Sequence, residues 1–398
     1  MVSPARLCLI CKGGRALCGN STCPLLPKFN LGKRLSGSFK KDFFGPSYSV
    51  FVGRFGYPDV NIGPMAAFED KPGIDDPTSW LDRKYGDIVE LRSLLLRSKE
   101  KENIKSRSRF ILDSQELTLS SKPTDVEMLF KKNPVYRVSF SDVTQPMGPS
   151  AALDRLRIAQ NIHVPRKVDR IVSDEMKSSQ ASYELYKAGQ DVHKVSVMLS
   201  SGVLGMGKSK KLVPTRWSIT ATDDMIFKQL AKDVRDFPSV NEYTVFSSKK
   251  LDNRFEVLLM PGSWEFENFE AWAPGSMWTA NLKKPEILEE YEPFKGRSRY
   301  AELQGGGYYA SRLGVIEGLH AMRRQARVVV FREVYEGYAV PLGVWQVREN
   351  VRNAFKGKAA KFATLKEALD DINRRLKLDI TEYKKQSKVL LRKTVFDF

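Results

Sequence analysis

Hydrophobic residues recur along the chain at two spacings, and these predict a mixture of strands and helices. Alternating or β-branched runs predict short strands at residues 47–52, 194–199, 216–222, 243–246, 254–260, 328–334 and 338–348. Apolar residues at helical spacing predict helices at 88–96, 113–129, 174–188, 224–234, 309–325, 364–378 and 379–392. No regular strand–helix–strand repeat appears, so the predicted fold class is a mixed α+β chain rather than a doubly wound sheet.

Length and composition predict several domains. The chain has 398 residues, which is more than one compact core holds. We expect a small N-terminal module at 1–30, a large α+β domain at 31–285, a smaller α+β domain at 286–380, and a basic helix with a tail at 381–398. A charged stretch bounded by prolines, at 283–299, sets the main division.

Basic residues outnumber acidic ones, 65 to 47, which gives a formal net charge of +18. A charge of this size predicts an anionic partner, with DNA or RNA first and an anionic membrane surface second. No apolar run is long enough to span a membrane, and no apolar segment of secretory length opens the chain. We therefore expect an intracellular protein of the cytoplasm, associated with the nucleoid and without a membrane partner.

All four cysteines lie in the first 23 residues, at Cys8, Cys11, Cys18 and Cys23. A Cys-x-x-Cys turn brings two thiolates to face one ion, and four thiolates suit a tetrahedral zinc. Two disulfides or an iron–sulfur cluster are the alternatives, but disulfides need an oxidising compartment. We therefore expect one structural zinc ion. Four thiolates would close its coordination and leave no position for a substrate.

A glycine-rich segment matches the phosphate-binding P-loop pattern Gly-x-x-x-x-Gly-Lys-Ser/Thr. A predicted strand precedes it, but Pro214 would break the helix that the motif needs after its lysine. A more general phosphate cradle, or a flexible basic loop, fits better than a nucleotide-hydrolase site. The candidate phosphate-binding residues are Gly202, Gly205, Gly207, Lys208, Ser209, Lys210, Lys211 and Arg216.

The stretch 264–278 alternates aromatic and acidic residues. We interpret it as core, with the aromatic rings turned inward and the glutamates outward, in preference to a base-stacking surface. The acids Glu265, Glu267, Glu270, Asp223 and Asp224 are magnesium-ligand candidates by residue type only, because their spacing adds no support.

Apolar residues at the end of the chain predict a fold-back segment or a partner-binding tail. The sliding-clamp-binding peptide, or PIP box, has Gln first, an aliphatic residue fourth, and aromatics seventh and eighth. Here Arg392 takes the first position, Val395 the fourth and Phe398 the seventh. The candidate clamp-binding residues are Arg392, Lys393, Thr394, Val395, Phe396, Asp397 and Phe398.

Several segments taken together resemble the archaeal Nre DNA-repair family. They are the cysteine knuckle, the segments 44–47 and 60–64, the run 210–221 and the terminal Val-Phe-Asp-Phe. The resemblance implies a DNA-damage-repair role and contact with the sliding clamp (PCNA) through residues 392–398, but it supplies no catalytic residues. We expect a repair factor with a DNA-facing basic body. The alternatives are a nucleotide- or nucleic-acid-processing enzyme that uses the glycine-rich loop, and an RNA- or ribosome-binding adaptor.

Overall fold

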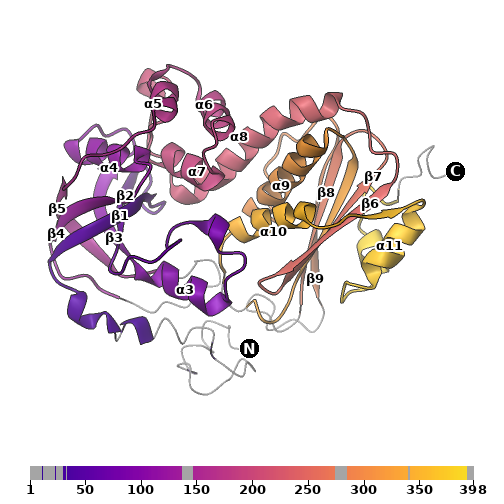
Figure 1. Ribbon diagram of the computed structural model, residues 1–398, viewed down its shortest axis with the longest axis horizontal. Helices are drawn as coiled ribbons and strands as arrows, with labels where there is room; N and C mark the ends of the chain where they lie inside the picture. The colour runs from indigo at the N-terminus through magenta and orange to yellow at the C-terminus, as the bar shows by residue number, and fades with distance from the viewer. Residues whose placement is uncertain are drawn as a thin grey trace. The chain divides into compact units, whose positions relative to one another are not determined.

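The computed structural model of the chain describes residues 11, 23, 30–32, 34–136, 147–273, 285–338 and 341–391. These form two compact units (Figure 1). The barrel unit consists of the described residues of Pro24–Ser139 and Pro146–Ile226, and the sheet unit of those of Phe227–Phe398. Helices and strands mix in both units, which confirms the predicted α+β class. Within the described segments, no helix has the length and apolar character needed to cross a membrane.

The barrel unit is built on a closed five-stranded barrel in the order β1-β2-β3-β5-β4. The first half of β1 pairs with β4 and its second half with β2, while β3 and β5 run parallel. This Greek-key barrel, with a helix between the third and fourth strands, is the OB fold. The elements are β1 (Asp42–Val52), β2 (Asp59–Ala67), β3 (Leu95–Asn103), α4 (Arg109–Leu119), β4 (Thr124–Phe130) and β5 (Ser150–Ile158).

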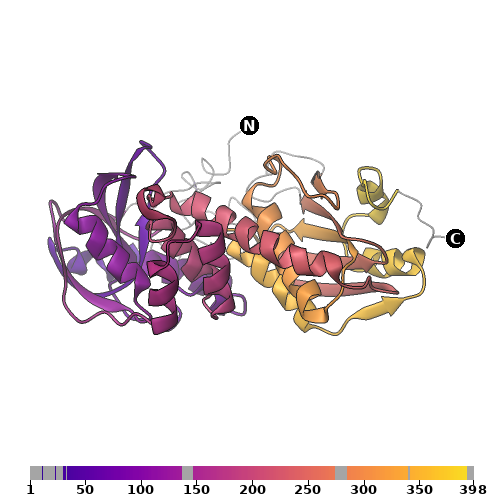
Figure 2. The same cartoon turned by 90° about the horizontal axis from the view of Figure 1, so that it is seen from above.

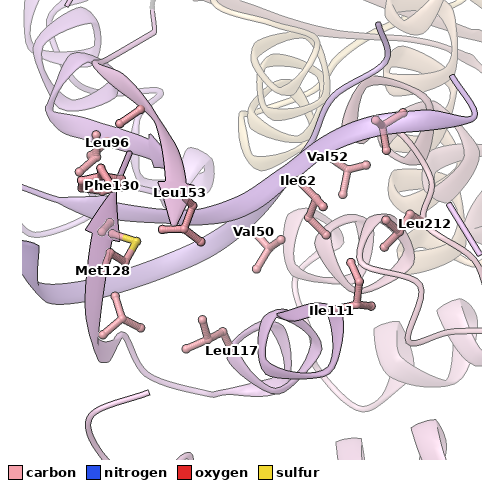
Figure 3. Packing of buried hydrophobic residues seen from close by; sticks show 14 of the residues in the cluster. Val50, Val52, Ile62, Leu96, Ile111, Leu117, Met128, Phe130, Leu153 and Leu212 are labelled. Atoms are coloured by element: carbon pink, nitrogen blue, oxygen red, sulfur yellow. The ribbon is translucent and has the colours of Figure 1, made fainter. Parts of the chain in front are cut away.

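Alternate residues of the strands fill the barrel interior (Figure 3). Val50 and Val52 of β1 point inward, as the predicted strand at 47–52 requires, and Ile62 of β2 lies beside them, while Phe130 of β4 lies beside Leu96 at the other end of the core. Leu212, far along the chain, completes this core. The segment around Leu212 is therefore fixed against the barrel.

Helices surround the barrel within the same unit. They are α3 (Tyr85–Leu94), α5 (Arg166–Ser173), α6 (Ser178–Lys187), α7 (Val192–Ser200) and the first part of α8 (Thr215–Asp236), with short 3-10 turns η1 (Ser36–Ser38), η2 (Pro77–Ser79) and η3 (Gly207–Ser209). The strands predicted at 194–199 and 216–222 are wrong, because these residues belong to α7 and α8. A short β-branched run looks the same in a buried helix as in a strand. The helix predicted at 113–129 is in fact α4 followed by β4.

The sheet unit contains a six-stranded sheet in the order β11-β6-β7-β10-β8-β9 (Figures 1 and 2). Only β10 and β8 pair in parallel. Helices α9 and α10 pack on one face and α11 and α12 on the other. The elements are β6 (Tyr243–Lys250), β7 (Asn253–Met260), β8 (Glu265–Trp272), β9 (Glu286–Glu292), α9 (Gly306–Met322), β10 (Arg327–Val334), α10 (Trp345–Lys356), β11 (Ala360–Phe362), α11 (Leu365–Asn373) and α12 (Ile380–Lys384).

Most sequence predictions hold in the sheet unit. The paired strands β6 and β7, the strand β10, the helix α9 and the capping box of Thr364 with Glu367 are confirmed. The strand predicted at 338–348 is wrong, since α10 begins at Trp345. The exposed helix predicted at 379–392 is also wrong, because α12 ends at Lys384 and the side chain of Tyr383 is buried. The predicted division at 285/286 falls between β8 and β9, which pair with each other.

The aromatic and acidic stretch lies in a sheet that helices cover on both faces, so side chains on either face can be buried. Trp264, Phe266 and Phe269 are buried, as predicted. Glu267 and Glu270 are buried as well, so the expectation that the glutamates point outward is wrong. No group of three or more acidic, histidine or cysteine side chains is placed to hold a metal among the residues described.

Candidate nucleic-acid interface

The loop between β1 and β2, residues 53–58, carries exposed aromatic and basic side chains. Val52 and Val60 on either side of it are buried, so both ends of the loop are anchored in the barrel. Gly56 has φ +83°, and a Cβ there would lie 2.8 Å from the carbonyl oxygen of Asp59, so the turn requires glycine. The Phe55 ring is 79% exposed, and the Arg54 guanidinium lies over it, 5.0 Å from the ring centroid.

The segment that leads into α8 lies beside this loop. The N–H of Leu212 donates to the carbonyl of Ile104 at 2.8 Å. The N–H of Val52 donates to the Thr215 hydroxyl at 2.9 Å. These bonds place Trp217 against Tyr57, with ring centroids 5.3 Å apart and the planes tilted by 55°. Trp217 is 46% and Tyr57 45% exposed, so water still reaches both rings.

Exposed cations occur on the segments that carry the rings and on a segment bonded to them. Nη2 of Arg107 lies 3.5 Å from the carbonyl of Gly207 and 3.4 Å from that of Lys210, which joins the start of α4 to the glycine-rich segment. We name as the L12 surface Arg54, Phe55, Tyr57, Arg107, Lys211, Arg216 and Trp217. Its four cations form no ion pair with any residue that the structure describes. Their charges are therefore not neutralised internally.

The exposed side of the barrel continues from the L12 surface along β2 and β3. Asn61 and Lys101 are directly opposite each other on these strands, and both are exposed. The nearby acids are engaged: Asp59 accepts a hydrogen bond from Asn103 at 2.8 Å, and Glu102 accepts one from the hydroxyl of Ser108. The continuation is thus polar, with charges of both signs.

A neighbouring part of the barrel wall is covered by other segments of the unit. The hydroxyl of the buried Ser49 donates to the Asp75 carboxylate. Burial alone raises the pKa of Asp75, but hydrogen bonds and charge from His193, Ser49 and Arg92 lower it overall. Burial also lowers the pKa of Lys194 to about 8. The Nζ of Lys194 donates to the carbonyl of Ser120, so α7 and the segment of Asp75 cover this part of the wall.

The glycine-rich segment does not have the backbone of a nucleotide-binding P-loop. It follows the helix α7, so the strand predicted before it is wrong. The N–H groups of Gly202, Ser209 and Lys210 donate to carbonyls of the same segment or of α7, and the Ser209 hydroxyl accepts from the N–H of Met206. Gly205 and Gly207 have positive φ and shape the turns. The predicted phosphate-binding residues Lys211 and Arg216 are exposed and belong to the L12 surface, and Lys208 is exposed outside it.

Sequence reasoning missed the central part of this surface. The available signal was Gly53-Arg-Phe-Gly-Tyr-Pro58, which sets an arginine and two aromatic residues in a turn rich in glycine and proline. Large side chains in a short turn between strands lie away from the core, so they are expected to be exposed. Trp217 gave no comparable signal, because only the packing of the segment 210–217 brings it to Tyr57.

The predicted zinc ligands and clamp-binding tail fall largely outside the described residues. Of the four cysteines only Cys11 and Cys23 are described, and Cys8 and Cys18 are not. Residues 392–398 are also outside. The zinc site and the clamp contact stay predictions.

The segment that precedes the tail is fixed to the sheet. Glu267 of β8 accepts hydrogen bonds from the hydroxyl of Ser387 and, at 2.6 Å, from the N–H of Lys388. Arg327 of β10 donates to the carbonyl of Val389 at 2.9 Å, and the Val389 side chain is buried. The chain therefore leaves the sheet at a defined point just before residue 392.

An OB barrel with exposed rings and unpaired cations at one end presents the kind of surface that binds nucleic acid in other proteins. Two family models match the chain: "Archaeal Nre, N-terminal" at residues 17–279 and "Archaeal Nre, C-terminal" at residues 292–396. The chain belongs to the archaeal Nre family, as its sequence predicted. The gap between the two models contains the predicted division at 285/286, whereas the compact sheet unit begins at Phe227. That domain division stays a prediction.

Three curated relatives extend over most of the chain. DNA repair protein NreB of Archaeoglobus fulgidus is 37% identical over 398 residues, which is 98% of this chain and 99% of the relative. DNA repair protein NreA of the same organism is 36% identical over 93% of both chains. DNA repair protein NreA of Haloferax volcanii is 34% identical over 89% of this chain and 88% of its own length. No solved structure matches the chain.

Proposed function

We propose that the chain is a DNA-repair protein that holds DNA on the L12 surface and binds the sliding clamp (PCNA) through residues 392–398. The relatives that share its full length are named DNA repair proteins. The observation that carries the DNA contact is the group of four unpaired cations, Arg54, Arg107, Lys211 and Arg216, at the accessible end of the barrel. Phosphates release counterions when such groups bind them, and this release drives association.

A charge-reversal pair tests the DNA contact. Arg107→Glu/Arg216→Glu should weaken oligonucleotide binding about tenfold or more and reduce the slope of log affinity against log salt by roughly 0.7–0.9 per lost contact. Fluorescence anisotropy of the full chain across a salt series measures both quantities. The matched control is Lys356→Glu/Lys366→Glu on the sheet unit, which changes two exposed lysines and the net charge by the same amount. Equal losses in the two variants would show that only net charge matters, against a site on the barrel.

The clamp contact is proposed on the tail sequence and on its anchored base. A segment fixed by Glu267 and Arg327 would present residues 392–398 from one position on the sheet. Deletion of 394–398 should abolish binding of the clamp in a titration with the intact protein as reference. Val395→Ala/Phe398→Ala should do the same. Lys393→Ala should keep the clamp affinity within about twofold, because a charged lysine side chain does not enter the apolar pocket. Equal clamp affinity with and without the tail would end this proposal.

The zinc site is proposed on the four cysteines alone. One structural zinc held by Cys8, Cys11, Cys18 and Cys23 would be closed to substrate. Metal analysis of the purified chain should give about one zinc per molecule. The variant Cys8→Ser/Cys11→Ser should lose it. Iron in place of zinc, or full metal content in the double variant, would contradict the assignment.

A further inference from the structure

Three large aromatic side chains lie exposed on the L12 surface. Phe55 is 79%, Trp217 46% and Tyr57 45% exposed. Leaving such a ring in water forgoes the stabilisation that its burial gives. Single exposed rings are common on protein surfaces, but a group at one place indicates a ligand that covers them.

The rings are held in position before any ligand arrives. Tyr57 lies in a loop whose two ends are anchored by buried valines, and it packs on Trp217. The N–H of Trp217 donates to the carbonyl of Pro214 at 2.8 Å, in the first turn of α8. The neighbouring Thr215 is bound to the end of β1 through its hydroxyl. A ligand that stacks on these rings therefore meets side chains whose positions are largely fixed.

The charges beside the rings decide the chemistry of the ligand. The Arg54 guanidinium lies over the Phe55 ring, Arg216 precedes Trp217 in the chain, and Lys211 and Arg107 are exposed on or bonded to the same segment. A ligand for this surface therefore combines flat apolar groups with repeated negative charge. An unpaired nucleic-acid strand has both, in its bases and its phosphates. The bases of a duplex are stacked on one another and present only their edges in the grooves, so a duplex can use the cations but not the ring faces.

The outer side of the barrel offers a short path for a nucleic-acid strand. From the rings, the accessible side continues over Asn61 and Lys101 of β2 and β3. Around Ser49, the wall is covered by the segments of Asp75 and Lys194. The β2–β3 side and the loop between β1 and β2 are where OB barrels accommodate oligonucleotides. A DNA strand that follows this short path would occupy the low end of the range of about 4–16 nucleotides per barrel.

We infer that the L12 surface binds single-stranded DNA in preference to duplex, with unpaired bases stacked on Phe55 and on the Tyr57–Trp217 pair. The inference deepens the proposed function, on which it rests, by naming the form of DNA that this surface takes. Arg54 and Arg216 contact the phosphates on either side of the stacked bases.

The test compares one strand with its duplex in the full chain. Tyr57→Ala/Trp217→Ala should weaken binding of an oligothymidine of about 12 nucleotides by roughly tenfold or more, since each stacked base contributes strongly. Duplex affinity should change less than about twofold, because its bases do not reach the rings. Phe44→Ala is the matched control: this ring on β1 is 66% exposed but lies outside the L12 surface, and its loss should leave both affinities unchanged.

A second variant separates stacking from folding. Trp217→Phe keeps an aromatic face, so it should retain most of the affinity for oligothymidine. It should also lose the part of the tryptophan fluorescence quenching that oligothymidine causes in the unaltered protein. An alanine variant that fails to fold would be recognised by its thermal unfolding, and Trp217→Phe would still report whether bases stack there. Quenching that persists unchanged in Trp217→Phe would contradict the inference.

The outcomes also distinguish this inference from the proposed function. If strand and duplex bind equally, and the charge-reversal pair weakens both, DNA binding stands and the single-strand inference is wrong. If oligouridine binds tighter than oligothymidine at the same salt, the ligand is RNA and the inference is wrong. If no nucleic acid binds at low salt, both statements fail, and the rings belong to a contact with another protein.

Discussion

The two units use charged side chains in opposite ways. In the sheet unit, charges are buried in pairs: Arg332 lies 2.7 Å from Glu270, and Arg327 lies 2.7 Å from Glu265. On the L12 surface of the barrel unit, cations such as Arg107 and Arg216 stay exposed and unpaired beside exposed rings. A buried pair fixes the positions of the segments it joins, whereas an unpaired exposed cation is available to an anionic ligand. The comparison shows that the sheet unit buries charges in pairs, whereas the proposed DNA contact relies on cations that stay exposed.

The largest expected effect lies in a buried pair of the sheet unit. Besides Glu270, Arg332 donates from Nη2 to Asn253 at 2.9 Å. Arg332→Met should lower the free energy of unfolding by about 3–5 kcal/mol, because Glu270 would remain buried without its cation. Denaturant unfolding measures this loss. The double variant Arg332→Met/Glu270→Leu removes both charges and should recover much of it. A single variant as stable as the unaltered chain would contradict the structural role of the pair.

The carboxylate that holds the base of the tail predicts a pH effect. Burial, together with the charge of Glu289, raises the pKa of Glu267 to about 7, although hydrogen bonds from Ser387 and the Lys388 N–H oppose this. The folded state therefore favours the protonated form. The resulting stability is complete below the ordinary pKa of a glutamate and is lost as pH rises through about 7.

Glu267→Gln should flatten this pH dependence. The amide is neutral at every pH and still offers an oxygen to the Lys388 N–H. As pH rises from 5 to 8, the free energy of unfolding of the variant should increase by about 2–3 kcal/mol relative to that of the unaltered chain. A tenfold change in proton affinity corresponds to roughly 1.4 kcal/mol. Thermal unfolding across this range measures the gain. Parallel curves for the two proteins would show that Glu267 titrates normally.

A smaller effect is expected in the loop of the barrel. Gly56→Ala places a Cβ 2.8 Å from the Asp59 carbonyl oxygen at a φ of +83°, so unfolding should become easier by about 1–3 kcal/mol. Oligonucleotide affinity should fall too, since the loop carries Phe55 and Tyr57. Gly37→Ala is the control, because a Cβ there meets nothing within 4 Å. A loop variant that loses stability but keeps full affinity would separate the turn from the site.

The smallest expected effect sharpens the contrast between the units. Arg107→Glu/Arg216→Glu should lower the free energy of unfolding by no more than about 1 kcal/mol, since neither side chain has an ion-pair partner among the described residues and only the two long hydrogen bonds of Arg107 are lost. Denaturant unfolding beside the binding titration measures it. A loss as large as that of Arg332→Met would place these arginines among the structural charges.

Sequence patterns located the long elements of the sheet unit better than the surface of the barrel unit. The run at 328–334 is strand β10 because every residue in it is buried, and an unbroken β-branched run fits that environment. The capping box of Thr364 and Glu367 is local and formed as predicted. Short apolar runs were ambiguous: residues 194–199 are a helix, although they read as a strand. The P-loop pattern likewise lacked the preceding strand, and the N–H groups of Gly202, Ser209 and Lys210 donate to carbonyls of the protein.

The sequence by itself determined the α+β class, the net positive charge and the family, because these follow from periodicity, composition and motifs that neighbouring residues carry. Tertiary structure alone decided which cations and rings share one surface. The bond between Val52 and Thr215 joins residues 163 positions apart, and it brings Trp217 to Tyr57. Closing the barrel also decided which wall is covered and which end stays accessible. Such contacts depend on packing between distant segments, which local spacing does not encode.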